Sequence, residues 1–530
     1  WRVRCMVKKM DADVIIVGGG LGGIAASLAA ARMGSRVILT EESKWIGGQM
    51  TGQAVPPDEH PWIEQFGATS TYRQFRDGVR RYYRNNYPLT PQARSNRHLN
   101  PGNGWVSKLC HEPKVGLAVL KEMLAPYVSN GRITVLLKHR PINAATHGNQ
   151  MEWIQVKNIE TSDVVELKGA YFLDATECGD VLPLVKAEYV VGAESQTETS
   201  EPDALAEADP TNMQSFTMCF AMDYLEGENH VIARPTDYDF WRNYRPDFWP
   251  DKLLSWTHPF PPTLEPWSRD LFYQPGRSIR DSLWLFRRII DRENFIEGEY
   301  QSDIVMVNWP QIDYWLGPII DVSETERDRH IEGAKQLSLS FLYWMQTEAP
   351  RPDGGRGYPG LRLRRDIVDS ADGLALPYIR ESRRIKAEFT ILQQDVSPQT
   401  RPDDQTATFP DSVGIGSYRI DLHPSTGGDN YLDVASLPFE IPLGSLIPVR
   451  IANLLAAGKN IGTTHITQGC YRLHPVEWNV GEAAGCLAAY CLQRKLKPKE
   501  VRNDKPRLRE YQGILEQQGV ELAWPKLTAR

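Results

Sequence analysis

The chain has 530 residues, a net charge of −7 and seven cysteines. This length accommodates two or more domains with a large core, and an acidic balance without a basic block excludes nucleic acid as an expected partner. No run of about 18 apolar residues occurs, so we predict no membrane span. The scattered cysteines form no C-x-x-C pair, which excludes a disulfide framework and a zinc site and favours a reducing cytoplasm. We likewise expect no signal peptide, because no apolar stretch precedes the first predicted strand.

The most informative stretch is DADVIIVGGGLGGIAASLAAARMGSRVILTEE, residues 11–42. Continuous β-branched residues at 14–17 predict a buried parallel strand. An alanine-rich segment at 24–33 predicts a helix, and residues 36–42 predict a second strand. Strand, helix and strand in this order predict a βαβ unit at the front of the chain.

A glycine motif joins the first strand to the helix. Gly18, Gly20 and Gly23 complete G-x-G-x-x-G, and Glu41 follows Gly23 by 18 residues. In this context the glycines let the backbone approach a pyrophosphate, the helix N-terminus stabilises its charge, and the acid accepts hydrogen bonds from a ribose. The same pattern recurs at 354–360, but prolines surround it and no strand precedes it, so we predict a loop there.

The residues after Glu41 favour FAD over NAD. A glycine pair, Gly47-Gly48, follows Glu41 within six residues, where a simple NAD domain would continue into another strand and helix. Further on, residues 132–158 predict strand, turn and strand, and residues 164–174 predict one more strand.

The region from about residue 186 to 435 has a different composition. Seven tryptophans occur between Trp241 and Trp315, and we expect most of them to pack in a core rather than line a site. Residues 325–346 predict a helix. The run PYIRESRRI, residues 377–385, is either a solvated charged face or a set of arginines that clamp a carboxylate or phosphate, and we favour the charged face.

The end of the chain returns to the pattern of a nucleotide-binding fold. Leu454 to Ala457 predict a short buried strand that stops at Gly458. Apolar residues at helical spacing over 476–491 predict a helix, with Pro475 in its first turn. Gly481 and Gly485 lie one turn apart, which predicts the close approach of another element.

These residues resemble the FAD-dependent oxidoreductase family whose core is shared with glutathione reductase, fumarate reductase flavoproteins and HdrA-like proteins. The shared pattern includes the H-x-x-x-G-x-x-R-x-x-P run at 465–475. The resemblance implies an α/β fold, with a Rossmann-like FAD-binding domain of the glutathione reductase type at 11–185 and 436–500. It also implies an inserted α+β substrate domain at 186–435 and a C-terminal helical tail at 501–530.

The resemblance further implies which residues bind FAD, although Glu177-Cys178 departs from the usual pattern after the Ala-Thr pair. The expected FAD-binding residues are Gly18, Gly20, Leu21, Gly22, Gly23, Glu41, Glu42, Gly47, Gly48, Gln49, Met50, Ile142, Ala175, Thr176, Gly458, Lys459, Asn460, Pro475, Trp478, Asn479 and Val480.

The last helix is expected to point its N-terminus at the pyrimidine edge of the flavin, where free backbone N–H groups stabilise negative charge. The amides of Val476, Trp478 and Asn479 are the candidates for this role.

The catalytic candidates are His465, Arg472 and His474, which we expect in a loop leading into this helix. A histidine supplies a base of near-neutral pKa, and Arg472 either binds a substrate anion or holds the loop. His423 and the CHEP stretch at 110–113 are weaker candidates.

We therefore expect an FAD-dependent dehydrogenase or oxidase that moves hydride from a small polar substrate to flavin N5, with oxygen or a carrier as oxidant. The alternatives are an FAD-dependent monooxygenase and a non-redox flavin-binding protein. A disulfide reductase is excluded because no cysteine lies between Gly48 and Cys110, and no second dinucleotide motif provides an NAD(P)H domain. We expect a small-molecule substrate and no metal, and leave open a homo-oligomer.

Overall fold

A five-stranded parallel sheet forms the base of the molecule in the computed structural model, which describes residues 7–368 and 370–525. The strand order is β23-β8-β2-β3-β4, and every neighbouring pair is parallel. The strands are β2 (Val14–Val17), β3 (Val37–Glu41), β4 (Ile133–Leu137), β8 (Tyr171–Asp174) and β23 (Leu454–Ala456). The predicted βαβ unit is confirmed, and the distant strand β23 joins the same sheet.

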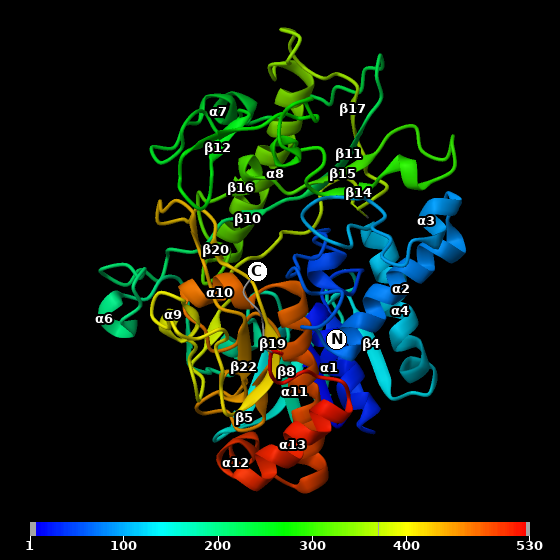
Figure 1. Cartoon of the computed structure of the whole chain (residues 1–530). Coiled ribbons are helices and arrows are strands. Elements are labelled where there is room, and N and C mark those ends of the chain that lie inside the picture. Colours follow the sequence, from blue (N-terminus) through cyan, green and yellow to red (C-terminus); the bar gives the residue numbers. More distant parts are fainter. Residues whose placement is uncertain (1–6, 369, 526–530) are drawn as a thin grey trace, which may run out of the picture.

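Two helices with glycine-rich contact faces pack beside this sheet: α1 (Leu21–Arg32) and α11 (His474–Arg494). Figure 1 shows the blue α1 next to the orange α11. A Cβ at Gly481 would overlap the backbone of Gly22, and one at Gly485 would overlap the backbone of Ala26. The close approach predicted from the two glycines is therefore confirmed, and α1 is its partner.

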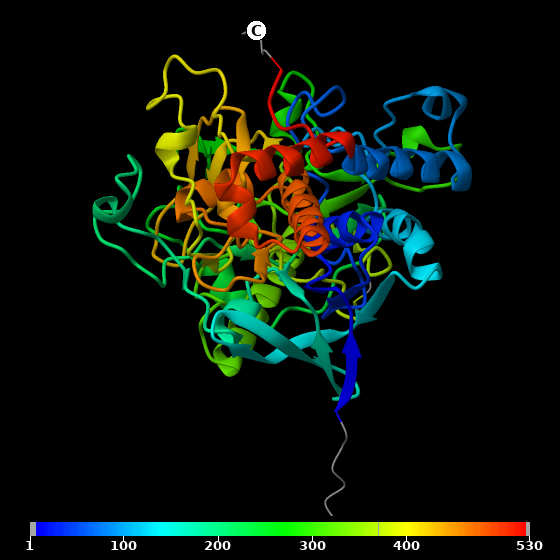
Figure 2. The same ribbon diagram turned by 90° about the horizontal axis from the view of Figure 1, so that it is seen from below.

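A second sheet of order β1-β7-β6-β5 lies beside the first. It contains β1 (Lys8–Asp11), β5 (His139–His147), β6 (Gln150–Asn158) and β7 (Val164–Lys168). Figure 2 shows the blue β1 next to the cyan strands. The single strand predicted over 164–174 is wrong, because the chain leaves one sheet after Lys168 and enters the other at Tyr171.

The middle region, green in Figure 1, lies above the parallel sheet and has its own cluster of buried apolar side chains. Its main sheet has the order β14-β15-β11-β17, with β11 (Phe220–Tyr224), β14 (Arg288–Ile290), β15 (Ile304–Val307) and β17 (Leu361–Leu363). Helix α8 (Glu324–Thr347) confirms the helix predicted there, and α7 (Tyr238–Asn243) packs on it.

The tryptophans of this region are mostly core residues, as predicted. Those buried in its apolar cluster are Trp241, Trp249, Trp284, Trp309, Trp315 and Trp344. The repeated glycine motif at 354–360 forms turns and loop, as predicted, and no helix starts there.

Small elements complete the described chain. Paired short strands are β9 (Tyr189–Val190) with β18 (Arg384–Ile385), β10 (Phe216–Thr217) with β16 (Asp313–Tyr314), β12 (Thr257–Pro259) with β13 (Pro266–Ser268), β19 (Ser412–Gly416) with β22 (Phe439–Pro442), and β20 (Ile420–Leu422) with β21 (Leu432–Val434). The remaining α-helices are α2 (Ser70–Asn86), α3 (Pro91–Ser95), α4 (Pro113–Ser129), α5 (Val181–Leu184), α6 (Gln196–Thr199), α9 (Gln393–Val396), α10 (His465–Tyr471), α12 (Pro498–Asn503) and α13 (Lys505–Gln517).

Within residues 7–368 and 370–525, no helix is both long and apolar enough to cross a membrane. The six cysteines in these ranges are free and buried, and Cys5 lies outside the described residues. No group of three His, Cys, Asp or Glu side chains in the same ranges is arranged to hold a metal ion.

Candidate functional site

The glycine turn between β2 and α1 lies at the carboxyl end of the parallel sheet, where β8 and β23 also end. Gly18 has a φ of 101°, a left-handed conformation that favours glycine, and a Cβ there would overlap the Ala175 backbone. A Cβ at Gly20 would first meet carboxylate oxygens of Glu177 and Glu477, at 2.9 and 3.2 Å. Gly18 therefore forms the turn, and Gly20 leaves space beside it.

Glu41, at the end of β3, stands next to this turn. Its carboxylate accepts hydrogen bonds from the backbone N–H groups of Gly19 (2.9 Å) and Ser43 (2.8 Å). Burial raises the pKa of Glu41 to about 7, because a desolvated carboxylate loses its stabilisation by water. Its remaining lone pairs are available to ribose hydroxyls.

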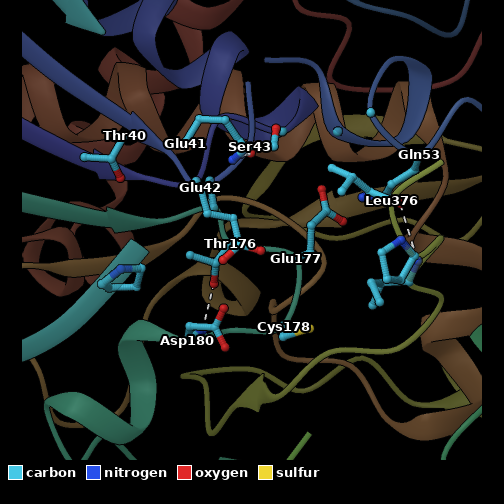
Figure 3. Close-up of a pocket in the computed structure, with 18 of the residues that line it drawn as sticks. Thr40, Glu41, Glu42, Ser43, Gln53, Thr176, Glu177, Cys178, Asp180 and Leu376 are labelled. Carbon is cyan, nitrogen blue, oxygen red and sulfur yellow. Dashed lines mark hydrogen bonds between the residues drawn. The ribbon is translucent and has the colours of Figure 1, made fainter. Parts of the chain in front are cut away.

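A cavity lies beside the turn and Glu41 (Figure 3). The predicted FAD-binding residues that line it are Gly18, Gly20, Glu41, Glu42, Gly48, Ala175 and Thr176. Sequence reasoning missed the other lining residues, which are Thr40, Ser43, Trp45, Gly52, Gln53, His139, Pro141, Glu177, Cys178, Asp180, Ile319, Arg327, Leu376, Pro377 and Ile379. The last five come from the middle region, where no motif signalled them.

Glu177 reaches into the middle of this cavity in Figure 3. Its Oε2 forms an ion pair with the ammonium of Lys459, whereas its Oε1 is buried and accepts no hydrogen bond from the described residues. A buried acceptor without a partner is costly, so this oxygen marks a place for a hydroxyl of a ligand. The sequence showed Glu177 only as a departure from a family pattern.

The residues around the cavity fit FAD, because the glycine turn, the head of α1, Glu41 and the unpartnered Glu177 oxygen lie together. Glu477 on α11 also faces the head of α1, where it accepts a hydrogen bond from the Gly22 N–H at 3.4 Å. Burial and the nearby Glu177 carboxylate raise the pKa of Glu477. A neutral carboxyl at this place can lie beside a phosphate without charge repulsion.

Other predicted FAD-binding residues do not line this cavity. They are Leu21, Gly22, Gly23, Gly47, Gln49, Met50, Ile142, Gly458, Lys459, Asn460, Pro475, Trp478, Asn479 and Val480. Ile142 is 37% exposed on β5, while His139 and Pro141 of the same strand face the cavity, because side chains of a strand alternate between faces. The Trp478 side chain donates to the Thr71 hydroxyl (2.8 Å) and that of Asn479 to the Val413 carbonyl (3.0 Å).

The start of α11 differs from the sequence expectation. The Glu477 N–H already donates to the Leu473 carbonyl, so the amides of Trp478 and Asn479 lie inside the helix, and the prediction that they are free is wrong. The amide of Val476 lies in the first turn, where no carbonyl of the helix faces it. Of the three candidate amides, only that one keeps the expected position.

His474, the first residue of α11, is fully buried. Its Nδ1 accepts a hydrogen bond from the Asp58 N–H (3.1 Å), and burial lowers its pKa to about 3. The hydrogen bond assigns the proton of the neutral ring to Nε2, which has no partner among the described residues. This geometry makes His474 a hydrogen-bond donor and not a base.

His465 begins helix α10 rather than lying in a loop, because Thr464 and Thr467 form a capping box that starts a helix. Its Nδ1 lies 2.9 Å from Glu381 Oε1. Burial alone would lower the pKa of His465, but the Glu381 carboxylate outweighs it and raises that pKa. His465 lines a second cavity together with His423, whereas Arg472 lines neither this cavity nor the first. The structure therefore does not bring the predicted catalytic residues to one cavity.

The segment 377–385 corrects another expectation, since it is not a solvated charged face. Arg380, Glu381 and Arg384 are at most 3% exposed. Arg380 pairs with Asp313 at 3.0 Å, and Arg384 pairs with Glu381 at 2.7 Å. Charged residues are buried when each has a partner, and the sequence does not show these pairings.

The structure separates the weaker catalytic candidates, which are His423 and the stretch 110–113. His423 has its Nδ1 2.7 Å from Asp313 and its Nε2 3.6 Å from Asp421. Cys110 and His111 are buried; burial raises the pKa of the Cys110 thiol to about 12 and lowers the pKa of His111 to about 4. Neither Cys110 nor His111 lines the two cavities, which leaves His423 as the stronger of these candidates.

Comparisons with known proteins add the family. The model of the FAD dependent oxidoreductase family matches residues 13–515. No curated protein sequence matches the chain significantly. Weak structural likeness exists to an L-proline dehydrogenase from P. horikoshii (16% identity, 35% of this chain and 24% of that chain, TM-score 0.19). An E. coli quinol fumarate reductase variant is similarly distant (12% identity, 97% of this chain and 74% of that chain, TM-score 0.30). So is a geranylgeranyl bacteriochlorophyll reductase-like protein from Thermoplasma acidophilum (10% identity, 97% of this chain and 85% of that chain, TM-score 0.30).

The chain spans about a quarter of the length of the proline dehydrogenase chain. The assignment to a family therefore rests on the family model, which matches residues 13–515. Together with the parallel sheet and its glycine turn, this match identifies a Rossmann-like FAD-binding fold. This protein belongs to the FAD-dependent oxidoreductase family, and FAD is its cofactor.

Proposed function

We propose that the protein is a dehydrogenase or oxidase that moves hydride from a small polar organic substrate to flavin N5, with oxygen or a carrier as the final oxidant. The observation that supports this most is a polar cluster at the start of α11. We call it the α11 cluster and define it as Asp58, Arg287, Tyr378, Asp421, Arg472 and His474. All but Asp421 are buried, and its members come from both ends and the middle of the chain.

The α11 cluster offers hydrogen-bond donors that are shielded from water. Arg472 donates to the Tyr378 hydroxyl (3.4 Å) and to the Asp421 carbonyl (3.2 Å), and His474 Nε2 has no hydrogen-bond partner among the described residues. Bound FAD supplies the two-electron acceptor. The chain itself supplies donors of fixed direction in a dry site, where electrostatic interactions are stronger than in water.

We propose His465 as the base that accepts a proton from the substrate. Glu381 orients the ring through Nδ1, which leaves Nε2 to exchange a proton, as in other histidine–carboxylate pairs. Because its pKa is raised, the base form of His465 increases with pH. We therefore expect the rate of flavin reduction to increase with pH until this group is deprotonated.

The finer family assignment is also a proposal. We propose the glutathione reductase type of FAD-binding domain, split into 11–185 and 436–500 by an inserted substrate domain at 186–435, and an HdrA-like relationship. The separate apolar cluster formed by side chains between Cys178 and Tyr431 supports an inserted domain.

The test is a spectrum of the purified protein, followed by anaerobic titration with sugars, amines, amino acids and hydroxy acids. We expect a yellow protein whose flavin is bleached by at least one class of substrate. NADH and NADPH should reduce the flavin slowly, because the chain carries a single dinucleotide motif in a strand-helix context. Rapid bleaching by NADPH in stopped flow would contradict the proposal and favour a monooxygenase or reductase.

A further inference from the structure

We propose that Arg287 and Arg472 form an anion site that binds a carboxylate group of the substrate, an inference that rests on the proposed function. Arg287 precedes strand β14 of the middle region, and Arg472 follows helix α10. Neither the glycine motif nor the family pattern pointed to Arg287. The proposal follows from counting the hydrogen bonds of the buried arginines.

Arg287 is a buried cation with too few partners. Arg287 is 8% exposed. Its side chain makes one hydrogen bond to the described residues, a long one of 3.3 Å from Nη1 to Asp58 Oδ1. Its Nε is buried and has no hydrogen-bond partner in the part of the chain that the structure describes. A guanidinium has five donors, and burying a charge is costly unless it is paired and hydrogen-bonded.

Two other buried arginines form more and shorter hydrogen bonds, although the Nε of Arg384 also lacks a partner among the described residues. Arg269 is an exception, with one side-chain bond of 3.3 Å to the Ser282 carbonyl. Arg76, 3% exposed, makes four hydrogen bonds of 2.8–3.1 Å to Glu59 and Glu64. Arg384, 0% exposed, makes three of 2.6–2.9 Å to two carboxylates and one carbonyl. Those two hold the fold together, whereas Arg287 has one long hydrogen bond to a single carboxylate.

Arg472 resembles Arg287 rather than these two. Its acceptors are the Tyr378 hydroxyl and the carbonyl and carboxylate of Asp421, at 3.2–3.4 Å. Its Nε is also buried, and no partner for it lies within residues 7–368 and 370–525. Two neighbouring guanidiniums therefore have unused donors.

Several contacts place the two arginines at one site. Asp58 meets the Arg287 guanidinium through its carboxylate and the His474 ring through its backbone N–H. The charges of Arg287 and Arg472 both act on the phenols of Tyr378 and Tyr418. Burial nevertheless keeps the pKa of both phenols raised, so these groups remain hydroxyl donors.

The charge of the site selects the ligand. Asp58 and Asp421 already lie beside the arginines and balance their two charges, so a phosphate dianion is disfavoured more than a singly charged group. The planar fork of a guanidinium matches the two oxygens of a carboxylate. A monocarboxylate end of a small substrate fits both conditions.

The test is a binding titration of the oxidised holoenzyme with glycolate and with its uncharged analogue glycolamide, followed by the perturbation of flavin absorbance. We expect glycolate to bind more tightly than glycolamide. Arg287→Gln should weaken glycolate binding about 10- to 100-fold and leave glycolamide unchanged. Arg287→Lys should weaken it less, because the charge remains and only the fork is lost. The control Arg292→Gln, an exposed arginine nearby, should change neither.

FAD content and thermal unfolding of each variant show whether it is folded, and Arg287→Lys and Arg472→Lys replace Arg287→Gln if that variant does not fold. Equal binding of glycolate and glycolamide, or unchanged glycolate binding in every Arg287 and Arg472 variant, would overturn the proposal. So would a variant that shifts the flavin potential but keeps glycolate binding, because Arg287 would then serve the flavin. These measurements need no turnover, so a protein that binds glycolate but oxidises no substrate contradicts the proposed function alone.

Discussion

Around the parallel sheet, the decisive contacts are between backbone atoms. Gly22 of α1 and Gly481 of α11 leave no room for side chains between the two helices, and Gly18 forms the turn between β2 and α1. In the middle region and at its border, side chains meet side chains, as in the pairs Arg380–Asp313 and Arg384–Glu381. A site built by backbone depends on one residue type at a few positions. A site built by side chains depends on charges that must find partners far along the chain.

The pKa values of buried carboxyl groups also differ between the two regions. Near the cofactor cavity, burial raises the pKa of Glu41 and of Asp174 to about 7. At the border with the middle region, burial acts on Glu381 and Asp421 too, but nearby histidines and arginines outweigh it and lower both pKa values. The first pair is protonated more readily, and the second pair remains charged and holds cations.

The strongest way to break this comparison is to add a methyl group between the two helices. Gly481→Ala is expected to prevent folding, because its Cβ would overlap the Gly22 carbonyl of α1, and cost more than about 4 kcal/mol. Gly20→Val should fold but lose FAD, because its side chain enters the cavity. The control Gly513→Ala, which meets nothing within 4 Å, should be neutral or stabilising. Circular dichroism and FAD content measure all three, and a folded, yellow Gly481→Ala protein would show that the helices can separate.

The next effect concerns chemistry carried by a side-chain pair. His465→Ala should lower the rate of flavin reduction by roughly 10²–10⁴, with normal FAD content, because His465 does not line the cofactor cavity. Stopped-flow reduction by the identified substrate measures this, with the exposed His147→Ala as control. An unchanged rate would remove His465 from the catalytic residues and leave His423 as the next candidate.

Arg472 and Arg384 are both buried, but we expect Arg472 to bind substrate and Arg384 to stabilise the fold. Arg472→Ala should raise the apparent KM about 10- to 100-fold, because its long hydrogen bonds leave it free to hold a substrate anion. Arg384→Ala should instead lower stability by about 3–5 kcal/mol, with a normal KM in the folded fraction, because its bonds are short and internal. Steady-state kinetics and urea unfolding separate the two, and loss of stability alone in Arg472→Ala would mean that it only braces the chain.

The smallest effect is a dependence of stability on pH. Glu41 and Asp174 have folded pKa values above their unfolded ones, so the folded state binds more protons and the free energy of unfolding falls as pH rises from about 4 to about 7. Glu381 and Asp421 have lowered values, so their contribution is lost only in acid, as pH falls through those values. We expect the apoprotein to be about 1–3 kcal/mol less stable at pH 8 than at pH 5, with a smaller difference in Glu41→Gln. A flat profile between these pH values would contradict the raised pKa values.

The sequence by itself determined the parts of the fold that arise from local pattern. The run Val14–Val17, the glycine turn and the acid Glu41 follow one another within 28 residues, so their geometry is fixed by short stretches of backbone. The helical spacing over 325–346 predicted α8 to within one residue at each end. Gly481 and Gly485 predicted a close contact with another element, which is α1.

Only the tertiary structure decided which side chains share a site. Arg327 of α8 reaches the cofactor cavity from the middle region, Glu177 meets Lys459 across 282 residues, and Arg287 meets Asp58 across 229. No local pattern encodes such pairs, because a buried charge is stabilised by whichever partner the fold brings near it. The same reason explains why the segment 377–385, which is as polar as a surface in sequence, is buried, and why His474 at the head of α11 is a neutral donor instead of a base.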